Sequence, residues 1–311
     1  MSDQVVAPVV ERAVQRTGSA GVLVVAAAVV WQGVGTAIVG STVTPSLATF
    51  ATFVAFAAAA AAAMAARTGI RARSGSPVPG SARMSLRDAV WINVATAGAF
   101  VSFYVAVTLV PPTASSVIET GVGPFAVTVL AVLRGGQTAR SLAWPVFVLA
   151  ACAGVAVLSV GGAQPPGSVG QTVLGVALSV LAGACAVGIL LASHRFARSG
   201  LGAVDVAAVR FHLAWVVCGA LAIPALASGV ADAAELRGVA LTAVLCVAAP
   251  ILLLQWGITL CPPLPASLVI ATLPAVVLAT EVLLEGRLDP VLSAAMGLLL
   301  VVSVLAALRS R

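Results

Sequence analysis

Apolar residues run through this chain in long stretches, and most charged residues fall in the short segments between them. Several stretches reach the roughly 20 residues that a helix needs to cross the hydrocarbon core of a bilayer. Glycine and proline turn signals, such as Pro111-Pro112 and Pro262-Pro263, separate them. The pattern predicts an all-α polytopic membrane protein with ten transmembrane helices, at about 18–39, 45–66, 88–110, 113–133, 142–160, 171–192, 206–228, 239–260, 266–284 and 290–308.

The composition supports lipid as the solvent of this chain. Of the 311 residues 61% are hydrophobic and 8% are charged, whereas soluble domains carry about 25% charged residues. A soluble core of this size cannot bury so much apolar surface. The basic residues, all arginines, lie mostly in short loops, so the net charge of +6 does not indicate nucleic-acid binding. The sequence shows no metal-ligand spacing and no phosphate-binding loop, and we expect no metal and no cofactor.

The distribution of arginines predicts the orientation. With the N-terminus in the cytoplasm and ten crossings, the outer segments hold only Arg237 and Arg287, and Arg210 lies within a span. The remaining arginines fall on the inner side, as the positive-inside rule requires. We therefore expect a multi-pass protein of the cytoplasmic (cell inner) membrane, with a cytoplasmic N-terminal tail over 1–17 and a cytoplasmic C-terminus at 309–311. The first apolar run is as long as a full span, so we expect a retained helix rather than a cleaved signal.

An internal repeat is visible in the chain. Residues 103–112 align with residues 254–263: each block ends a span and turns on two prolines. Each is followed by a span with a mid-helix proline, Pro124 in one case and Pro274 in the other. The alignment predicts two five-helix repeats, 18–160 and 171–308, joined by a linker over 161–170. Five crossings are an odd number, so the two repeats would be inverted, an arrangement common in secondary transporters.

A set of short motifs resembles the EamA-type carriers of the drug/metabolite transporter superfamily over nearly the whole chain. The matching pieces are Trp31 with Gly33, Tyr104-x-Ala106 leading to Pro111, the helix with Pro124, the helix with Pro274, the turn Glu285-Gly286-Arg287-Leu288, and Gly297. The sequence departs from the family in two places: Gln32 separates Trp31 from Gly33, and Arg134-Gly135-Gly136 replaces an acidic turn in the first half. The resemblance implies a central cavity and alternating access without ATP.

Within that superfamily, Ile118-Glu119 followed by Gly123-Pro124 is similar to the branch that exports threonine and homoserine. A carboxylate at membrane depth costs several kcal/mol and normally faces a polar cavity or a partner. Glu119 lies about 9 Å into its span at 1.5 Å per residue. Gly123 leaves space on the same face, and Pro124 frees a backbone carbonyl. We predict that Glu119 binds a substrate amine, exchanges a proton, or does both; the alternative is a packing lock to a polar neighbour.

Other polar and aromatic residues would complete a mostly apolar pocket. The predicted substrate-binding residues besides Glu119, Gly123 and Pro124 are Trp31, Gln32, Asn93, Tyr104, Gln255, Trp256 and Pro274. The alternative for each polar one is an interhelical hydrogen bond. We expect Arg210 to extend to the headgroups and Glu281 to belong to a solvated helix end. His212 is a weak candidate for a proton relay.

Together these features predict a secondary active transporter that exports small amino acids or related metabolites, coupled to protons, and plausibly a monomer. Two alternatives stay open. One is a broader drug or metabolite exporter, or an importer, with the same fold. The other is a membrane enzyme acting on lipid, for which the chain lacks a polar cluster at headgroup level; we therefore expect no enzymatic activity.

Overall fold

In a computed structural model of the chain, the described residues are 3–73, 84–106, 109–162, 169–229, 231–286 and 289–309. Every regular element within these ranges is a helix, as the sequence predicts. Eight helical segments are long and apolar enough to cross a bilayer: Ala20–Val39, Ala48–Arg73, Thr113–Leu133, Ala139–Gly161, Val169–Arg198, Ala203–Ala227, Ala233–Leu260 and Pro263–Leu284. The protein is therefore a multi-pass helical membrane protein.

Two further helices correspond to predicted spans but do not meet the same criterion within the described residues. One is α3 (Leu86–Ala106), which begins with charged residues. The other is α13 (Pro290–Arg309), whose qualifying apolar part, Pro290–Ser303, is shorter than a full span. The count of ten crossings stays a prediction.

Helices in the first half of the chain are uninterrupted. They are α1 (Asp3–Thr42), α2 (Ala48–Arg73, after a 3-10 turn at Pro45–Leu47), α3, α4 (Pro112–Leu133) and α5 (Ala143–Gly162, after a 3-10 turn at Ala139–Leu142). The helix α1 already begins at Asp3, inside the segment expected to be a tail, and α4 continues through Pro124.

Three predicted spans in the second half are interrupted, which the sequence analysis did not foresee. After α6 (Val169–Arg198), α7 (Ala203–Arg210) and α8 (His212–Ala227) meet at Phe211. The helix α9 (Ala233–Ala243) passes through a π-helical segment, Val244–Ala248, into α10 (Ala249–Leu260). Finally, α11 (Pro263–Ile270) and α12 (Leu273–Glu285) are separated by two turn residues. There Pro274 lacks an N–H and its ring crowds the carbonyl of Ile270, so the helix stops before it.

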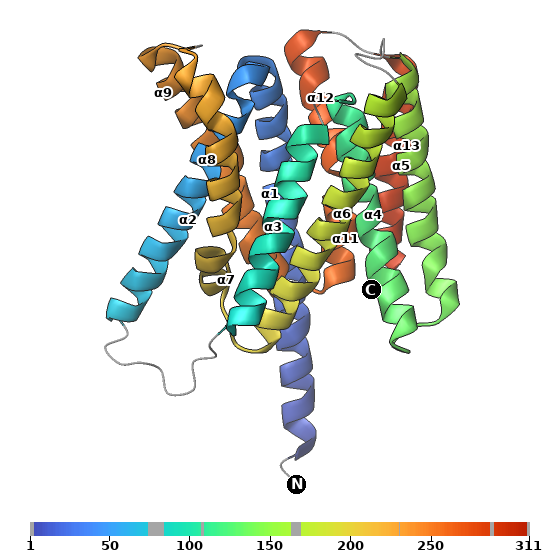
Figure 1. The fold of residues 1–311 in the computed structure, drawn as a ribbon. Helices are drawn as coiled ribbons and strands as arrows, with labels where there is room; N and C mark the ends of the chain where they lie inside the picture. The colour runs from blue at the N-terminus through green and yellow to red at the C-terminus, as the bar shows by residue number, and fades with distance from the viewer. Residues whose placement is uncertain are drawn as a thin grey trace.

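The helices stand side by side as a bundle (Figure 1). The pair α5 and α13 packs together on one side, and α2 packs against α8 and α9 on the other. Between them, α1 packs against α10 and α12, and α6 packs against α3 and α4. An aromatic cluster fixes the position of the α7–α8 break: the buried ring of Phe56 on α2 lies 5.8 Å from that of Phe211 and 4.6 Å from that of Phe100 on α3.

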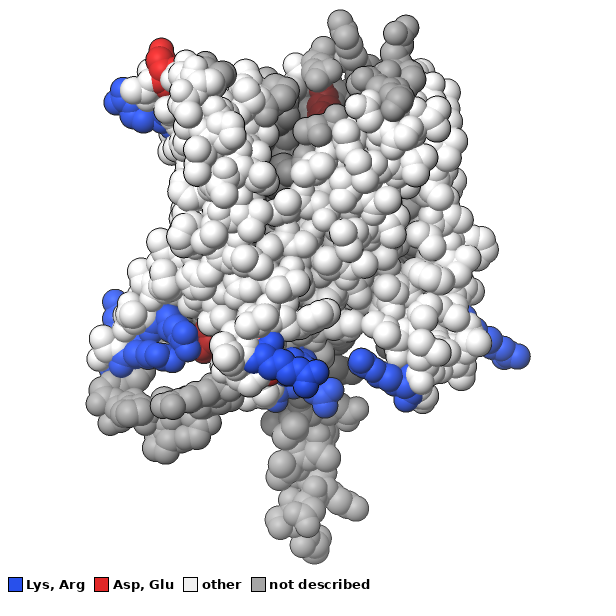
Figure 2. Space-filling view, in the orientation of Figure 1, with Lys and Arg blue, Asp and Glu red and all other residues white. Residues whose placement is uncertain are grey.

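Charged residues concentrate at one end of the bundle. Figure 2 shows a belt of arginine side chains at the lower end of the molecule, near the ends of α2 and α6 and the start of α3. Two ion pairs lie in this belt, Arg67–Asp205 at 2.9 Å and Arg195–Asp88. The belt has the asymmetry that the positive-inside rule associates with a cytoplasmic face, so this orientation stays our prediction.

Candidate functional site

The first part of the candidate site lies where α4 meets α6. Glu119 on α4 is half-buried. A Cβ atom on Gly183 of α6 would lie 2.5 Å from the backbone carbonyl oxygen of Glu119. Only a glycine allows the two helices to approach this closely at the level of the acid.

Short polar side chains line the same stretch of α4. The hydroxyl groups of Ser115 and Ser179 are hydrogen-bonded across the α4–α6 interface at 2.9 Å. Within α4, Thr128 donates to the carbonyl oxygen of Pro124 at 2.9 Å. Because Pro124 has no N–H, the carbonyl of Thr120 lacks its usual helical donor. The neighbourhood of Glu119 therefore offers acceptors as well as an acid, the combination that suits an ammonium group or a proton.

Two glycines near Glu119, Gly121 and Gly123, differ in how tightly they are packed. A Cβ on Gly121 would lie 2.6 Å from the Cβ of Cys152, so this face of α4 is tightly packed against α5. A Cβ on Gly123 would lie 3.5 Å from the Cβ of Ser267 on α11, an ordinary contact. The looser packing is on the Gly123 face, which is the face predicted to hold substrate.

The second part of the candidate site lies at the α7–α8 break. Asn93 on α3 donates to the carbonyl oxygen of Val209 at 2.7 Å and accepts from the N–H of Leu213 at 3.0 Å. It also donates to Ala89 O at 2.9 Å. These bonds satisfy backbone groups that the break leaves without helical partners. For Asn93 they favour the interhelical alternative over the predicted substrate contact.

Arg210, at the end of α7, does not extend to the headgroups as expected. Its exposed fraction is 5%, because α7 packs among α2, α3, α6 and α10. Its guanidinium donates from Nη1 to Oε1 of Gln255 on α10 and lies 4.7 Å from the ring centroid of Phe211. The hydroxyl of Ser193 on α6 also donates to this oxygen, at 3.5 Å.

The polar cluster of Arg210, Gln255 and Ser193 is the feature that the sequence analysis missed. Gln255 is predicted there as a substrate contact, but nothing in the spacing of the three residues indicates that they meet. One sequence signal could have indicated the cluster: Arg210 lies inside an apolar span. Charged residues are rare in such spans and normally have a specific partner.

His212 begins α8 and is held locally. Its Nε2 lies 3.0 Å from the carbonyl oxygen of Ala208, and Trp215 Nε1 donates to its Nδ1 at 3.5 Å. Both ring nitrogens are therefore engaged within one turn of the chain, which does not favour a long-range proton relay.

The remaining predicted residues are dispersed. Trp31 and Trp256 are 44% and 52% exposed, Gln32 is half-buried on α1, and Pro274 is buried at the start of α12. Glu281 is half-buried on α12. The side chain of Tyr104 and the whole of Arg287 lie outside the described residues.

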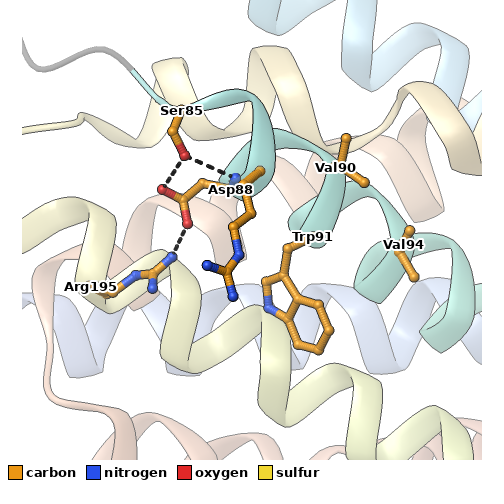
Figure 3. A pocket seen from close by; sticks show the side chains of 7 residues that line it. Ser85, Asp88, Val90, Trp91, Val94 and Arg195 are labelled. Atoms are coloured by element: carbon orange, nitrogen blue, oxygen red, sulfur yellow. Dashed lines mark hydrogen bonds and ion pairs between the residues drawn. The ribbon is translucent and has the colours of Figure 1, made fainter.

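A separate pocket opens at the arginine-rich end, on the outer sides of α3 and α6. It encloses about 730 Å³ and is lined by Ser85, Arg87, Asp88, Val90, Trp91, Val94 and Arg195. Figure 3 shows that Ser85 and Asp88 cap the start of α3, with the Ser85 hydroxyl donating to Asp88 at 2.8 Å, and that Arg195 pairs with the same carboxylate. Trp91 is 55% exposed. This arrangement is typical of the membrane interface.

No family model matches this chain, and no curated protein matches it. A solved crystal structure of a protein superposes with a TM-score of 0.66, over 94% of this chain and 99% of that chain, at 17% sequence identity. At this identity the likeness concerns the fold alone.

Proposed function

We propose that this protein is a proton-coupled secondary transporter that exports small amino acids, similar to threonine or homoserine, or related metabolites by alternating access. The observation that carries the proposal is Glu119. It is a half-buried acid within the membrane span, and it takes part in neither of the ion pairs, Arg67–Asp205 and Arg195–Asp88, found in the described part of the chain.

A carboxyl group is suited to proton exchange in such a place. It can meet the cost of burial by taking up a proton, and it can release that proton when water or a cationic substrate reaches it. The acceptors around Pro124 and the looser Gly123 face give a substrate ammonium group a place to bind beside it.

The close contacts of α1 and α6 support an inverted repeat. Three close contacts along α1, at positions 25, 33 and 35, have the same spacing as three along α6, at positions 175, 183 and 185; α1 has one more, at Gly21. Each helix meets helices of the other repeat in the matching order, as expected for two five-helix repeats related by a two-fold axis. Gly33 meets Val276 on α12 as Gly183 meets Glu119 on α4.

The other two positions follow the same exchange. Val25 meets Gly257 in the predicted eighth span, as Gly175 meets Val110 in the third. Gly35 meets Cys246 in the predicted eighth span, as Cys185 meets Gly98 in the third. The interrupted helices of the second half add support, because many transporters place their substrate sites at discontinuous helices.

Transport in reconstituted vesicles tests the proposal. Wild-type protein and Glu119→Gln are compared with radiolabelled threonine and homoserine, with and without a pH gradient. We expect gradient-driven transport by the wild type and its loss in Glu119→Gln, while the matched control Glu235→Gln, an exposed acid on α9, stays active. Full activity of Glu119→Gln would refute the role of this acid. Competition by unlabelled drugs and other metabolites separates an amino acid exporter from a broader carrier.

A further inference from the structure

We propose that Arg210, Gln255 and Ser193 form an anion site that binds the carboxylate group of the transported molecule. This inference rests on the proposed transport function and adds a second, chemically distinct binding position to it. It assigns a role to Arg210, which the resemblance to known carriers does not cover.

Arg210 places a permanent positive charge inside the protein. An arginine side chain keeps its proton in proteins, so unlike a buried acid it cannot escape burial by becoming neutral. Arg210 is 95% buried, and the two ion pairs of the described residues use Arg67 and Arg195 instead. A permanent cation inside a membrane protein calls for an anion.

The cluster also has more hydrogen-bond donors than acceptors. Oε1 of Gln255 is the oxygen that accepts hydrogen bonds within the cluster. It already accepts one from Nη1 of Arg210 and one from the hydroxyl of Ser193. Nε of Arg210 and Nε2 of Gln255 are buried and have no hydrogen-bond partner. Both groups are therefore available to donate to an added acceptor, and a carboxylate oxygen is the acceptor that a guanidinium group binds most strongly.

The elements that carry the site are short or adjoin interruptions of a helix. Arg210 is the last residue of α7, immediately before the break at Phe211. Gln255 lies on α10, which follows the π-helical segment Val244–Ala248. The donors are closed off from solvent in this conformation, so an anion would enter when these short helices move. Many transporters form their substrate sites at discontinuous helices, and π-helical segments are frequent at functional sites.

The carboxylate site and Glu119 are separate positions. Gly183 and Ser193, the α6 residues that contact Glu119 and Gln255, are ten positions apart, or about 15 Å along the helix. In an amino acid the nitrogen lies roughly 2.5 Å from the carboxylate carbon, from standard bond lengths. One molecule therefore meets the two charges in succession. The site of Arg210 is nearer the arginine-rich end, where an exported molecule would enter.

Thermal unfolding of the purified full-length protein tests the site without requiring transport. Sodium acetate replaces the sodium salt of a bulky anion, 2-(N-morpholino)ethanesulfonate, in steps, so that the ionic strength stays constant. A parallel titration uses sodium chloride in place of acetate. We expect a saturable rise of roughly 2 °C or more in the unfolding midpoint with acetate. The rise should be absent in Arg210→Gln and kept in Arg237→Gln, an exposed arginine of α9.

Gln255→Glu serves as the second variant, because it places a permanent carboxylate beside Arg210. We expect it to fold and to be at least as stable as the wild type, yet to lose the acetate response. An acetate response that persists in both Arg210→Gln and Gln255→Glu would overturn the site. So would a chloride response equal to that of acetate, or an absence of any acetate response in the wild type.

Transport measurements separate this inference from the function on which it rests. Threonine should compete for transport and threoninamide, which lacks the carboxylate, should compete at least tenfold less well. If the wild type transports threonine but Arg210→Gln does so with unchanged KM, the carboxylate site is wrong and the transport function stands. If no amino acid is transported but the acetate response depends on Arg210, the anion site stands and the assignment of amino acids as substrates is wrong.

Discussion

The two halves of this molecule place their buried charges in different ways. Glu119 lies on α4, an uninterrupted helix of the first half, and is half-buried. Arg210 lies in the second half, at the end of a short helix beside a break, and is 5% exposed. The acid can be neutralised by a proton, whereas the arginine cannot. In the proposed mechanism the first half therefore binds the proton and the second half binds an anion.

Two prolines show the same contrast in the backbone. Pro124 and Pro274 occupy corresponding places in the two predicted repeats, yet α4 continues through the first while the helix stops before the second. In α4 the hydroxyl of Thr128 bonds the carbonyl of Pro124, and the tight α4–α6 contact holds the helix in place. At this position the helix is therefore continuous in the first half and interrupted in the second half.

The largest expected effect comes from separating α4 from α6. In Gly183→Ala the new Cβ would lie 2.5 Å from the carbonyl oxygen of Glu119. Because that atom belongs to the backbone, the helices must move apart, at a cost of about 1–3 kcal/mol in the free energy of unfolding. We also expect transport to be lost. In the control, Gly123→Ala, the new Cβ would meet Ser267 at 3.5 Å, and the folded protein should be as stable as the wild type. Equal stability of Gly183→Ala, from chemical denaturation in detergent, would contradict the close approach.

A somewhat smaller effect is expected at the break. Asn93→Ala removes the hydrogen bonds to Val209 O and Leu213 N. These backbone groups would be left unpaired, at a cost of about 1 kcal/mol in the free energy of unfolding. The control Thr52→Val removes a buried hydroxyl that only bonds back to Ala48 within the uninterrupted α2, so it should cost much less. If the two variants unfold at the same denaturant concentration, the break does not depend on Asn93.

The bond between Ser115 and Ser179 should matter less than either of these. Ser115→Ala deletes it, but the hydroxyl of Ser179 keeps its bond to the carbonyl of Gly175 at 2.8 Å. Interhelical bonds of this type contribute about 0.6 kcal/mol on average. The double variant with Ser179→Ala should add little further. A loss above about 2 kcal/mol in a double-mutant cycle would show that α4 and α6 depend on this bond rather than on the glycine contact.

The smallest effect is expected at the start of α9. Backbone N–H groups of Glu235 and Ala234 bond the carboxylate of Asp232 and lower its pKa below its ordinary value of 3.8. A lowered pKa means that the charged cap stabilises the folded protein above that ordinary value and that this contribution is lost as the pH falls through the lowered pKa. Wild type should therefore unfold at a slightly higher temperature than Asp232→Asn at pH 6, and the difference should disappear in strong acid. A difference that grows on acidification would contradict the cap.

The sequence predicts the helical membrane class and most helix positions, because apolar length alone decides them. The sequence also draws attention to Glu119 and Gln255 as candidate site residues, since polar side chains are uncommon within apolar spans. It does not reveal the break at Phe211, where no proline or glycine is adjacent. The π-helical segment Val244–Ala248 does have a signal that the prediction passed over: Pro250 follows it and removes the helical donor to the carbonyl of Cys246. Nor does it place Arg210 against Gln255, because that contact depends on how α7 and α10 pack and not on any local pattern.

The central claim is that Glu119 carries the proton that moves with the substrate. The most direct test is proton flux: a pH-sensitive dye inside proteoliposomes reports on protons when a threonine gradient is imposed without a pH gradient. We expect substrate-dependent proton movement by the wild type and by Glu235→Gln, and none by folded Glu119→Gln. Undiminished proton movement by Glu119→Gln would contradict it.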